Sequence, residues 1–199
     1  MLRLAEASER ILADIKPLDI ESVPLRQALG RVLAEDIVAT VTMPPWRNSS
    51  MDGYAVRSAD ITPVMTGQRV KLRVVGTIAA GDFAKRPIRR GEAMRIMTGA
   101  PVPDGADSVI RKEDTDGGAE KVEIREARDV WKNVRPAGED YQRGDLLAKR
   151  GLPLKPALLG VLASTGLRKV KTFRRPQVAI ISSGDELVEI EDFEKVEEG

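Results

Sequence analysis

A turn around Asp52 carries the carboxylate that stands out chemically in this sequence. Pro44-Pro45 leads into it in an extended conformation, since proline fixes φ and donates no N–H. The polar side chains of residues 48–50 can bond nearby backbone, which favours turns. Asp52-Gly53 is a tight-turn dipeptide, and Tyr54-Ala55-Val56 then begins a strand. The turn therefore presents a carboxylate at a loop tip, beside hydroxyls and backbone donors, unless Asp52 only closes the turn.

Two further loops hold residues that could act with this carboxylate. Thr98 lies in the loop 97–103, where it places a hydroxyl at a strand end next to a glycine. Alternatively, Thr98 is a turn residue that bonds its own backbone. Arg135, Glu139 and Asp140 cluster around a proline and a glycine. Such a cluster is usually a solvent-exposed loop of ion pairs.

A fourth group of polar residues comes after a continuous apolar run at 177–181. Such a run is typical of a strand buried on both faces of a parallel sheet. Ser183, Gly184, Asp185 and Glu186 come directly after it, at the place where α/β folds bind ligands. A single parallel strand cannot bury itself, so we expect that this sequence ends inside a domain whose other elements lie outside it.

The composition limits the chemistry that these residues can perform. The 199 residues include no cysteine and no histidine. Disulfides, zinc–thiolate sites, thiol nucleophiles and Ser-His-Asp triads are therefore excluded from this chain. Any metal ion would be a hard cation with oxygen ligands, such as Mg²⁺. Aromatic residues make up only 4% of the chain, so aliphatic side chains must fill its core.

Charge and hydropathy exclude two classes of partner. The formal net charge is +1, with 32 basic and 31 acidic residues, which argues against nucleic-acid binding driven by bulk charge. No apolar run is long enough to span a bilayer, so no membrane partner is expected. The first residues lack a signal-peptide pattern, because Glu6, Glu9 and Arg10 interrupt it. The sequence therefore predicts a cytoplasmic protein.

Hydrophobic periodicity predicts the elements that must position these loops. Apolar residues at helical spacing predict helices at 4–15, 24–30 and 155–166. Runs of β-forming or alternating residues predict strands at 32–41, 71–74, 93–97, 108–111, 121–125 and 169–173. We expect the segment from Pro44 to Trp131 to form a compact antiparallel barrel or sandwich.

Four segments in one order resemble the amino-terminal half of the MoeA family. They read PPWRNSSMDGYAV, RIMTGAPVPDGADSVI, NVRPAGEDYQRGDLL and RRPQVAIISSGDELVE. This family comprises the molybdopterin molybdenumtransferases, and gephyrin is its animal relative. One departure is Ser183, where the family often has threonine, although the hydroxyl is kept. The resemblance covers nearly the whole chain.

The resemblance implies a mixed α/β, multi-domain fold. Residues 1–43 and 133–174 would form an elongated MoeA N-terminal domain, with 44–132 inserted into it as a β-rich, barrel-like lobe. Residues 175–199 would be the first strand of a truncated α/β molybdopterin-binding domain. Family members are roughly twice as long as this chain, which agrees with a sequence that ends inside a domain.

The resemblance also implies a role in molybdenum cofactor biosynthesis. Family enzymes insert molybdate, or tungstate, into adenylylated molybdopterin with release of AMP, and use Mg²⁺. The matching catalytic positions are Asp52, Thr98, Asp140 and Glu186. The matching substrate-binding positions are Arg135, Ser183, Gly184 and Asp185. Asp52 and Glu186 would be the Mg²⁺ ligands, as hard oxygen donors.

The same resemblance implies particular partners. A homodimer is expected, with a MogA-like adenylyltransferase as a further partner. The 199-residue chain by itself is expected to be inactive, because most of the pterin-binding domain is missing. An alternative of another class is a non-catalytic binding or scaffold module of the gephyrin type. The codons after Gly199 in the encoding gene would distinguish the two, because only the enzyme requires a complete pterin-binding domain.

Overall fold

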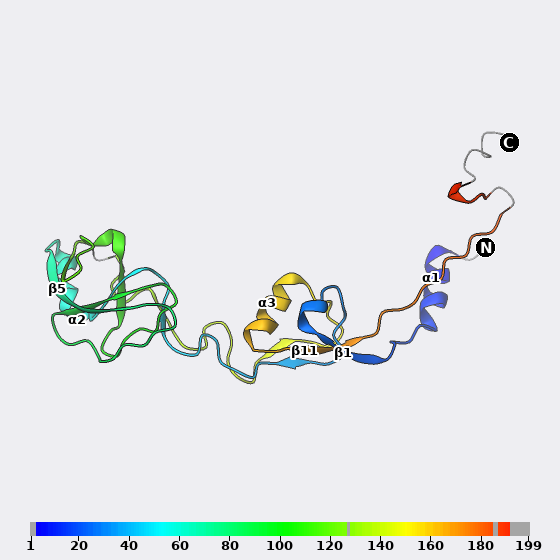
Figure 1. The fold of residues 1–199 in the computed structure, drawn as a ribbon, viewed down its shortest axis with the longest axis horizontal. Coiled ribbons are helices and arrows are strands. Elements are labelled where there is room, and N and C mark those ends of the chain that lie inside the picture. The colour runs from blue at the N-terminus through cyan, green and yellow to red at the C-terminus, as the bar shows by residue number, and fades with distance from the viewer. Residues whose placement is uncertain (1–2, 127, 185–186, 192–199) are drawn as a thin grey trace. The chain divides into compact units, whose positions relative to one another are not determined.

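The computed structural model describes residues 3–126, 128–184 and 187–191. The chain divides into two compact units, which Figure 1 traces. Unit 1 comprises Met1–Glu35 and Lys149–Gly199, and unit 2 comprises Asp36–Ala148. Their bounds differ from the predicted domain bounds at residues 43 and 132, and the domain scheme stays a prediction. No helix of the described residues is long and apolar enough to cross a membrane.

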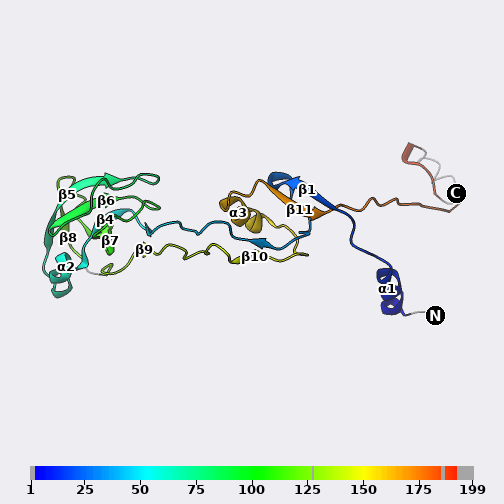
Figure 2. The same ribbon diagram turned by 90° about the horizontal axis from the view of Figure 1, so that it is seen from below.

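Unit 2 is built on a five-stranded sheet, in the order β7-β4-β6-β5-β8 (Figure 2). The strands are β4 (Gly53–Val56), β5 (Val70–Ile78), β6 (Glu92–Ile96), β7 (Ser108–Arg111) and β8 (Lys121–Ile124). The prediction of a wholly antiparallel lobe is wrong, because β5 and β6 pair in parallel. Residues 79–91 carry the chain back before β6 begins, so this pair is not a hairpin.

The predicted strands of this sheet are otherwise confirmed. The segments predicted at 93–97, 108–111 and 121–125 correspond to β6, β7 and β8, with bounds that differ by at most one residue at either end. The strand predicted at 71–74 is the first part of the longer β5. Period-two alternation indicated the strands at 71–74 and 121–125. The strands predicted at 93–97 and 108–111 do not alternate, because nearly all of their residues are buried.

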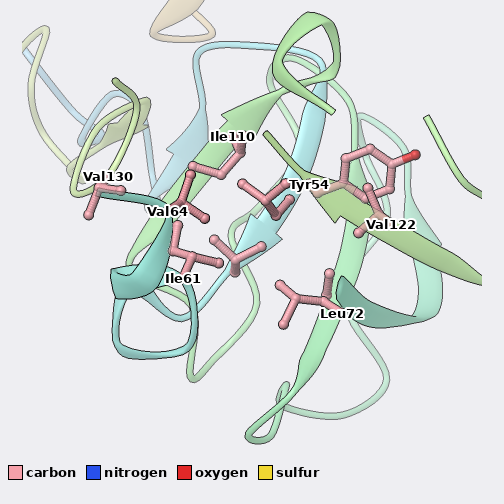
Figure 3. Packing of buried hydrophobic residues seen from close by; sticks show 10 residues of the cluster. Tyr54, Ile61, Val64, Leu72, Ile110, Val122 and Val130 are labelled. Carbon is pink, nitrogen blue, oxygen red and sulfur yellow. The ribbon is translucent and has the colours of Figure 1, made fainter. Parts of the chain in front are cut away.

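Two aliphatic clusters cover the two faces of β4. Tyr54 and Val56 pack with Ile110 and Val122 on one face, as Figure 3 shows for the labelled residues. Ala55 belongs to a second cluster with Ile78, Met94, Ile96 and Val109. All four residues of β4 are buried. Burying each large aliphatic side chain contributes about 1.5–3 kcal/mol, so β4 is anchored on both faces directly after Asp52.

The two short helices after β4 pack on one face of this sheet. α2 (Ser58–Ile61) and η2 (Thr62–Thr66) follow β4 directly, and η3 (Lys112–Asp114) follows β7. Ile61 and Val64 place two buried side chains in the cluster of Tyr54 (Figure 3). Asp107 holds the first turn of α2, since its Oδ1 accepts a hydrogen bond from the Ser58 N–H at 2.7 Å.

Two short antiparallel pairs complete unit 2. β3 (Asn48–Ser49) pairs with β9 (Val134–Arg135), and β2 (Ile37–Val38) pairs with β10 (Leu146–Ala148). The long strand predicted at 32–41 is therefore wrong beyond Ile37–Val38. Its partner changes along the chain, because Leu33 forms a bridge with Thr172 whereas Val38 lies opposite Leu146.

Unit 1 contains a two-stranded sheet and a helix. β1 (Ile20–Pro24) pairs antiparallel with β11 (Lys169–Phe173), which confirms the strand predicted at 169–173. α3 (Pro156–Ser164) confirms the helix predicted at 155–166. Gly166 follows it with a φ of 80°, a backbone conformation that ends helices and favours glycine.

The two remaining helix predictions differ in outcome. α1 (Leu4–Ala13) confirms the amphipathic helix at the start of the chain. The helix predicted at 24–30 is only one 3₁₀ turn, η1 (Leu25–Gln27). Pro24 is the last residue of β1 and lies opposite Lys169, so the backbone is still extended where the helix was expected to start.

The strand signature at 177–181 does not give a strand in this structure. Residues 177–181 lie in no helix or strand, and Val178, Ile180 and Ile181 are 77–90% exposed. Among the described residues, no strand pairs with this segment. An apolar run becomes a strand only when neighbouring strands satisfy its backbone and cover its faces.

Candidate functional site

Asp52 lies at the tip of the turn between β3 and β4, and both sides of the turn are held. The Ser49 hydroxyl donates a hydrogen bond to the Met51 carbonyl oxygen at 2.6 Å and accepts one from the Met51 N–H at 3.2 Å. On the other side, a Cβ placed on Gly53 would lie 2.0 Å from the carbonyl oxygen of Ile110. Glycine is therefore required for β4 to approach β7, and the turn is fixed at both ends.

The Asp52 carboxylate is bonded by the second loop that the sequence singled out. The Thr98 N–H and the Thr98 hydroxyl both donate to Oδ1 of Asp52, each at 2.7 Å. The Thr98 N–H and then its hydroxyl hold the pKa of the Asp52 carboxyl below its ordinary value, with smaller contributions from Arg95 and Lys112. Asp52 is thus an ionised, exposed carboxylate whose hydrogen bonds cross between loops.

Backbone bonds join three of the four motifs around β3. The Ser49 N–H donates to the Ala100 carbonyl, and the Gly99 N–H donates to the Ser49 carbonyl at 2.8 Å. On its other edge, β3 pairs with β9, which places Asn48 opposite Arg135. The loops that carry Asp52, Thr98 and Arg135 therefore belong to one hydrogen-bonded assembly within unit 2.

Arg135 is paired with the two carboxylates that the sequence placed beside it. Its Nε bonds Glu139, and its NH2 group lies 2.6 Å from Oδ1 of Asp140. These bonds, with that of Glu139 first, raise the pKa of Arg135 above its ordinary value. The Asp140 N–H donates to the Met43 carbonyl at 3.0 Å, which fixes this loop to the entry of the Asp52 loop. The three side chains are partly exposed, so an anion at Arg135 would compete with both carboxylates.

Two cations beside Asp52 were missed by sequence reasoning. A small cavity of about 70 Å³ is lined by Asp52, Gly53, Tyr54, Arg95, Met97 and Lys112. Arg95 lies opposite Tyr54 in the pairing of β4 with β6, and the Lys112 N–H donates to the Asp52 carbonyl at 3.0 Å. The sequence offered no signal for this arrangement, because it depends on which strands become neighbours.

A family model described as "MoeA N-terminal region (domain I and II)" matches residues 2–166. This chain belongs to the MoeA family. The match covers the Asp52, Thr98 and Arg135 loops together with every described strand except β11. It confirms the family that the four motifs indicated.

MoeA relatives from bacteria and a solved archaeal structure agree with this assignment. The molybdopterin molybdenumtransferase of Staphylococcus epidermidis strain RP62A is 36% identical over 191 residues, which are 96% of this chain and 46% of that protein. That of Staphylococcus aureus strain Mu50 is 36% identical over 187 residues, 94% and 45% of the two chains. The chain thus spans about half the length of these curated relatives.

The molybdopterin biosynthesis moeA protein from Pyrococcus horikoshii OT3 is similar in structure. It superposes with a TM-score of 0.86 at 34% identity, covering all of this chain and 53% of that chain. A second crystal structure described as moeA protein from Pyrococcus horikosii gives a TM-score of 0.69 over 88% of this chain. The mixed α/β fold is therefore a MoeA fold.

The fourth MoeA motif is only partly described. Ser183 and Gly184 are exposed and lie outside any helix or strand. Asp185 and Glu186, which the sequence placed in the site, lie outside the described residues. The Gly184 carbonyl accepts a hydrogen bond from the Leu187 N–H at 3.1 Å. Within unit 2, the structure therefore brings together Asp52 and Thr98, and separately Arg135 and Asp140.

The Asp52 carboxylate can supply one ligand oxygen to a hard cation. Oδ1 accepts both bonds from Thr98, whereas Oδ2 makes no hydrogen bond within the described part of the chain. Carboxylate oxygens are the ligands that Mg²⁺ prefers. No group of three or more acidic residues suited to a metal ion occurs among residues 3–126, 128–184 and 187–191. Asp52 can thus contribute one oxygen, and further ligands would have to come from elsewhere.

Proposed function

We propose that this chain acts in molybdenum cofactor biosynthesis, as the part of a molybdopterin molybdenumtransferase that contains the Asp52 loop. The carrying observation is the pair of hydrogen bonds from Thr98 that keeps Asp52 ionised at an exposed loop tip. The names of the relatives support the reaction class, that of a molybdopterin molybdenumtransferase. The motif resemblance adds the details that we propose, namely insertion of molybdate, or tungstate, into adenylylated molybdopterin with release of AMP.

The lowered pKa of Asp52 favours a role in binding a cation over a role as general base. A general base works best when its pKa lies near the operating pH, whereas the pKa of Asp52 is held below its ordinary value. An ionised carboxylate with one unused oxygen would instead hold Mg²⁺ beside a phosphate-bearing substrate. The bound ion would neutralise charge on phosphate oxygens. Thr98 would orient the carboxylate through its two hydrogen bonds.

The remaining residues take roles that the resemblance supplies. Arg135 would bind an anionic group of the substrate, and Asp140 would orient Arg135 through their ion pair. Glu186 would be the second Mg²⁺ ligand. Ser183, Gly184 and Asp185 would bind the pterin substrate near it. Together with Asp52, these residues would form a complete site that binds Mg²⁺, the pterin substrate and its anionic group.

We further propose a cytoplasmic homodimer that receives its substrate from a MogA-like adenylyltransferase. In this scheme residues 44–132 form the inserted lobe, 1–43 and 133–174 the elongated domain, and 175–199 the beginning of the pterin-binding domain. Relatives are about twice as long as this chain. The 199-residue chain alone is therefore expected not to release AMP.

A chimera tests the proposal directly. This chain would replace the matching 46% of the Staphylococcus epidermidis relative, and AMP release from adenylylated molybdopterin would be measured with molybdate and Mg²⁺. Asp52→Asn should lower the rate by about 10²-fold, as expected when a charge that stabilises the transition state is removed. Asp116→Asn is the matched control, because Asp116 is also exposed, lies in a turn and has a lowered pKa.

Three results are informative. A folded chimera whose rate is unaffected by Asp52→Asn would refute the role of Asp52. An equal loss in Asp52→Asn and Asp116→Asn would indicate a general effect on folding. AMP release by the 199-residue chain alone, at a rate like that of the full-length relative, would refute the claim that it is inactive by itself.

A further inference from the structure

Arg95 and Lys112 differ from most arginines of the sheet in unit 2. Most arginines there form ion pairs with carboxylates, namely Arg69, Arg73, Arg86, Arg111, Arg125 and Arg128. Within the described residues, the side chains of Arg95 and Lys112 form no hydrogen bond or ion pair. Both nevertheless line the same small cavity, so this cavity has two positive charges without an ion-pair partner.

The cavity's size limits what it can hold. Its volume is about 70 Å³, whereas pockets for drug-sized ligands are about 300–1,000 Å³. A fused heteroaromatic ring system is too large to enter. A tetrahedral group of one central atom and four oxygens is of the right order, since a water molecule in liquid takes about 30 Å³.

The charges around the cavity favour an anion. Two cations face one carboxylate, Asp52, whose Oδ1 is already used by Thr98. The Tyr54 hydroxyl donates to the Gly118 carbonyl at 3.0 Å, so this phenol keeps its proton and adds no negative charge. The lining is therefore positive by one charge and carries guanidinium and ammonium donors. Such donors bind oxyanions through charge-assisted hydrogen bonds.

We propose that Arg95 and Lys112 bind a tetrahedral oxyanion in this cavity. The ligand would be the phosphoryl group of a phosphate ester or free molybdate. The choice between these two ligands rests on the proposed function, whereas the binding of an oxyanion follows from the cavity alone. Arg95 comes from β6 and Lys112 follows β7, so the sheet fixes both on either side of β4. The two residues would hold the charged end of a substrate next to Asp52, and its larger rings would lie outside.

Titration of the purified 199-residue chain tests this inference without any enzymatic assay. Amide ¹H–¹⁵N spectra would be recorded at constant ionic strength with phosphate, molybdate and AMP, and with adenosine as the uncharged control. We expect saturable shifts at Gly53 and Thr98 with the oxyanions and none with adenosine. Binding of AMP and phosphate would indicate that a phosphoryl group is held, and binding of molybdate alone would indicate the free oxyanion.

Variants separate this site from general surface charge. Arg95→Gln and Lys112→Gln should each weaken oxyanion binding about tenfold, the effect of losing one charge-assisted bond. Lys121→Gln removes the same charge from an exposed residue outside the cavity, and should leave binding unchanged. Asp52→Asn should tighten binding measured without Mg²⁺, because it removes a repulsive charge.

Two results would overturn the inference. One is the absence of saturable shifts with every oxyanion while the spectrum remains that of a folded protein. The other is equal weakening by Lys112→Gln and Lys121→Gln, which would mean that the anions respond to overall charge only. Either result leaves the AMP-release test of Asp52 intact, so failure of this inference can be told apart from failure of the proposed function.

Discussion

At the scale of single residues, the charge state of Asp52 depends on two bonds from one partner. The Thr98 N–H contributes most to the lowered pKa of Asp52, and the Thr98 hydroxyl contributes next. A variant that lacks only the hydroxyl separates these two contributions to the pKa. In Thr98→Val, the pKa of Asp52 should rise toward 3.8 without reaching it, because the backbone N–H remains.

A carboxyl ¹³C titration of the 199-residue chain measures this change. Asp116 serves as the internal control, since its carboxylate bonds the Gly118 and Glu123 N–H groups and does not contact Thr98. An Asp52 pKa that stays the same in Thr98→Val would show that the hydroxyl bond is not formed in solution.

Glu92 is a second carboxylate that its hydrogen-bond partners keep ionised, and these bonds contribute to the stability of unit 2. Its side chain is 6% exposed and pairs with Arg86 at 2.8 Å and Arg73 at 2.6 Å. The bond from Arg86, with those from the Arg89 N–H and Arg73, lowers the pKa of Glu92 from 4.5 to about 2. A depressed pKa gives stability that is present above the unfolded-state pKa and lost as the pH falls through the folded-state pKa.

The free energy of unfolding should therefore fall by about 3 kcal/mol from this group as the pH drops from about 6 to about 2. Glu92→Gln should lack this component, so the difference between the two proteins should shrink as the pH falls. Urea unfolding at a series of pH values measures it, and the other carboxylates cancel in the comparison. A difference that is independent of pH would contradict the lowered pKa of Glu92.

At the scale of elements, β4 is confined between β6 and β7 and tolerates no side chain at its first residue. A Cβ on Gly53 would lie 2.0 Å from the Ile110 carbonyl oxygen. Gly53→Ala should therefore push β4 and β7 apart and destabilise unit 2 by about 1–3 kcal/mol or more. It should also displace Asp52 from Thr98.

Gly76→Ala is the matched control in β5. A Cβ on Gly76 would meet nothing closer than Met94 Cγ at 3.9 Å. This substitution should be neutral or stabilise by about 0.5 kcal/mol, because alanine costs less backbone entropy than glycine. Thermal unfolding of both variants measures the contrast, and equal midpoints would mean that the backbone contact at Ile110 relaxes at little cost.

At the scale of the whole molecule, the proposed homodimer makes a prediction about how sites are shared. The MoeA resemblance implies that Asp52 of one protomer acts with Glu186 of the other. A two-fold dimer repeats such a contact twice, so a mixed dimer has one intact and one doubly damaged site. In an equal mixture of Asp52→Asn and Glu186→Gln chimeras, up to about one quarter of all sites should be intact. AMP release should recover to about that fraction of the unmutated chimera's rate.

Each variant mixed with itself gives the baseline, and proven exchange of subunits is the necessary control. Absence of recovery after exchange would place both carboxylates in one protomer's site. It would leave the pKa and stability predictions for unit 2 unchanged, because those depend on contacts within one chain.

The sequence by itself determined the local elements and the chemistry that is available. Alternation identified β8 and the first part of β5, and the proline and glycine that bound α3 marked its ends. These signals are readable because they depend on residues a few positions apart. The absence of cysteine and histidine limited any metal site to oxygen ligands, and four ordered motifs identified the MoeA family.

Only the tertiary structure decided which of these local pieces meet. It pairs Asp52 with Thr98, 46 residues away, and places Arg95 and Lys112 in the same cavity. It also makes β5 and β6 parallel, and no strand of the described residues pairs with 177–181. Such pairings are set by the order of strands in a sheet and by long-range packing. No local pattern records them, because the same alternation suits a strand beside any partner.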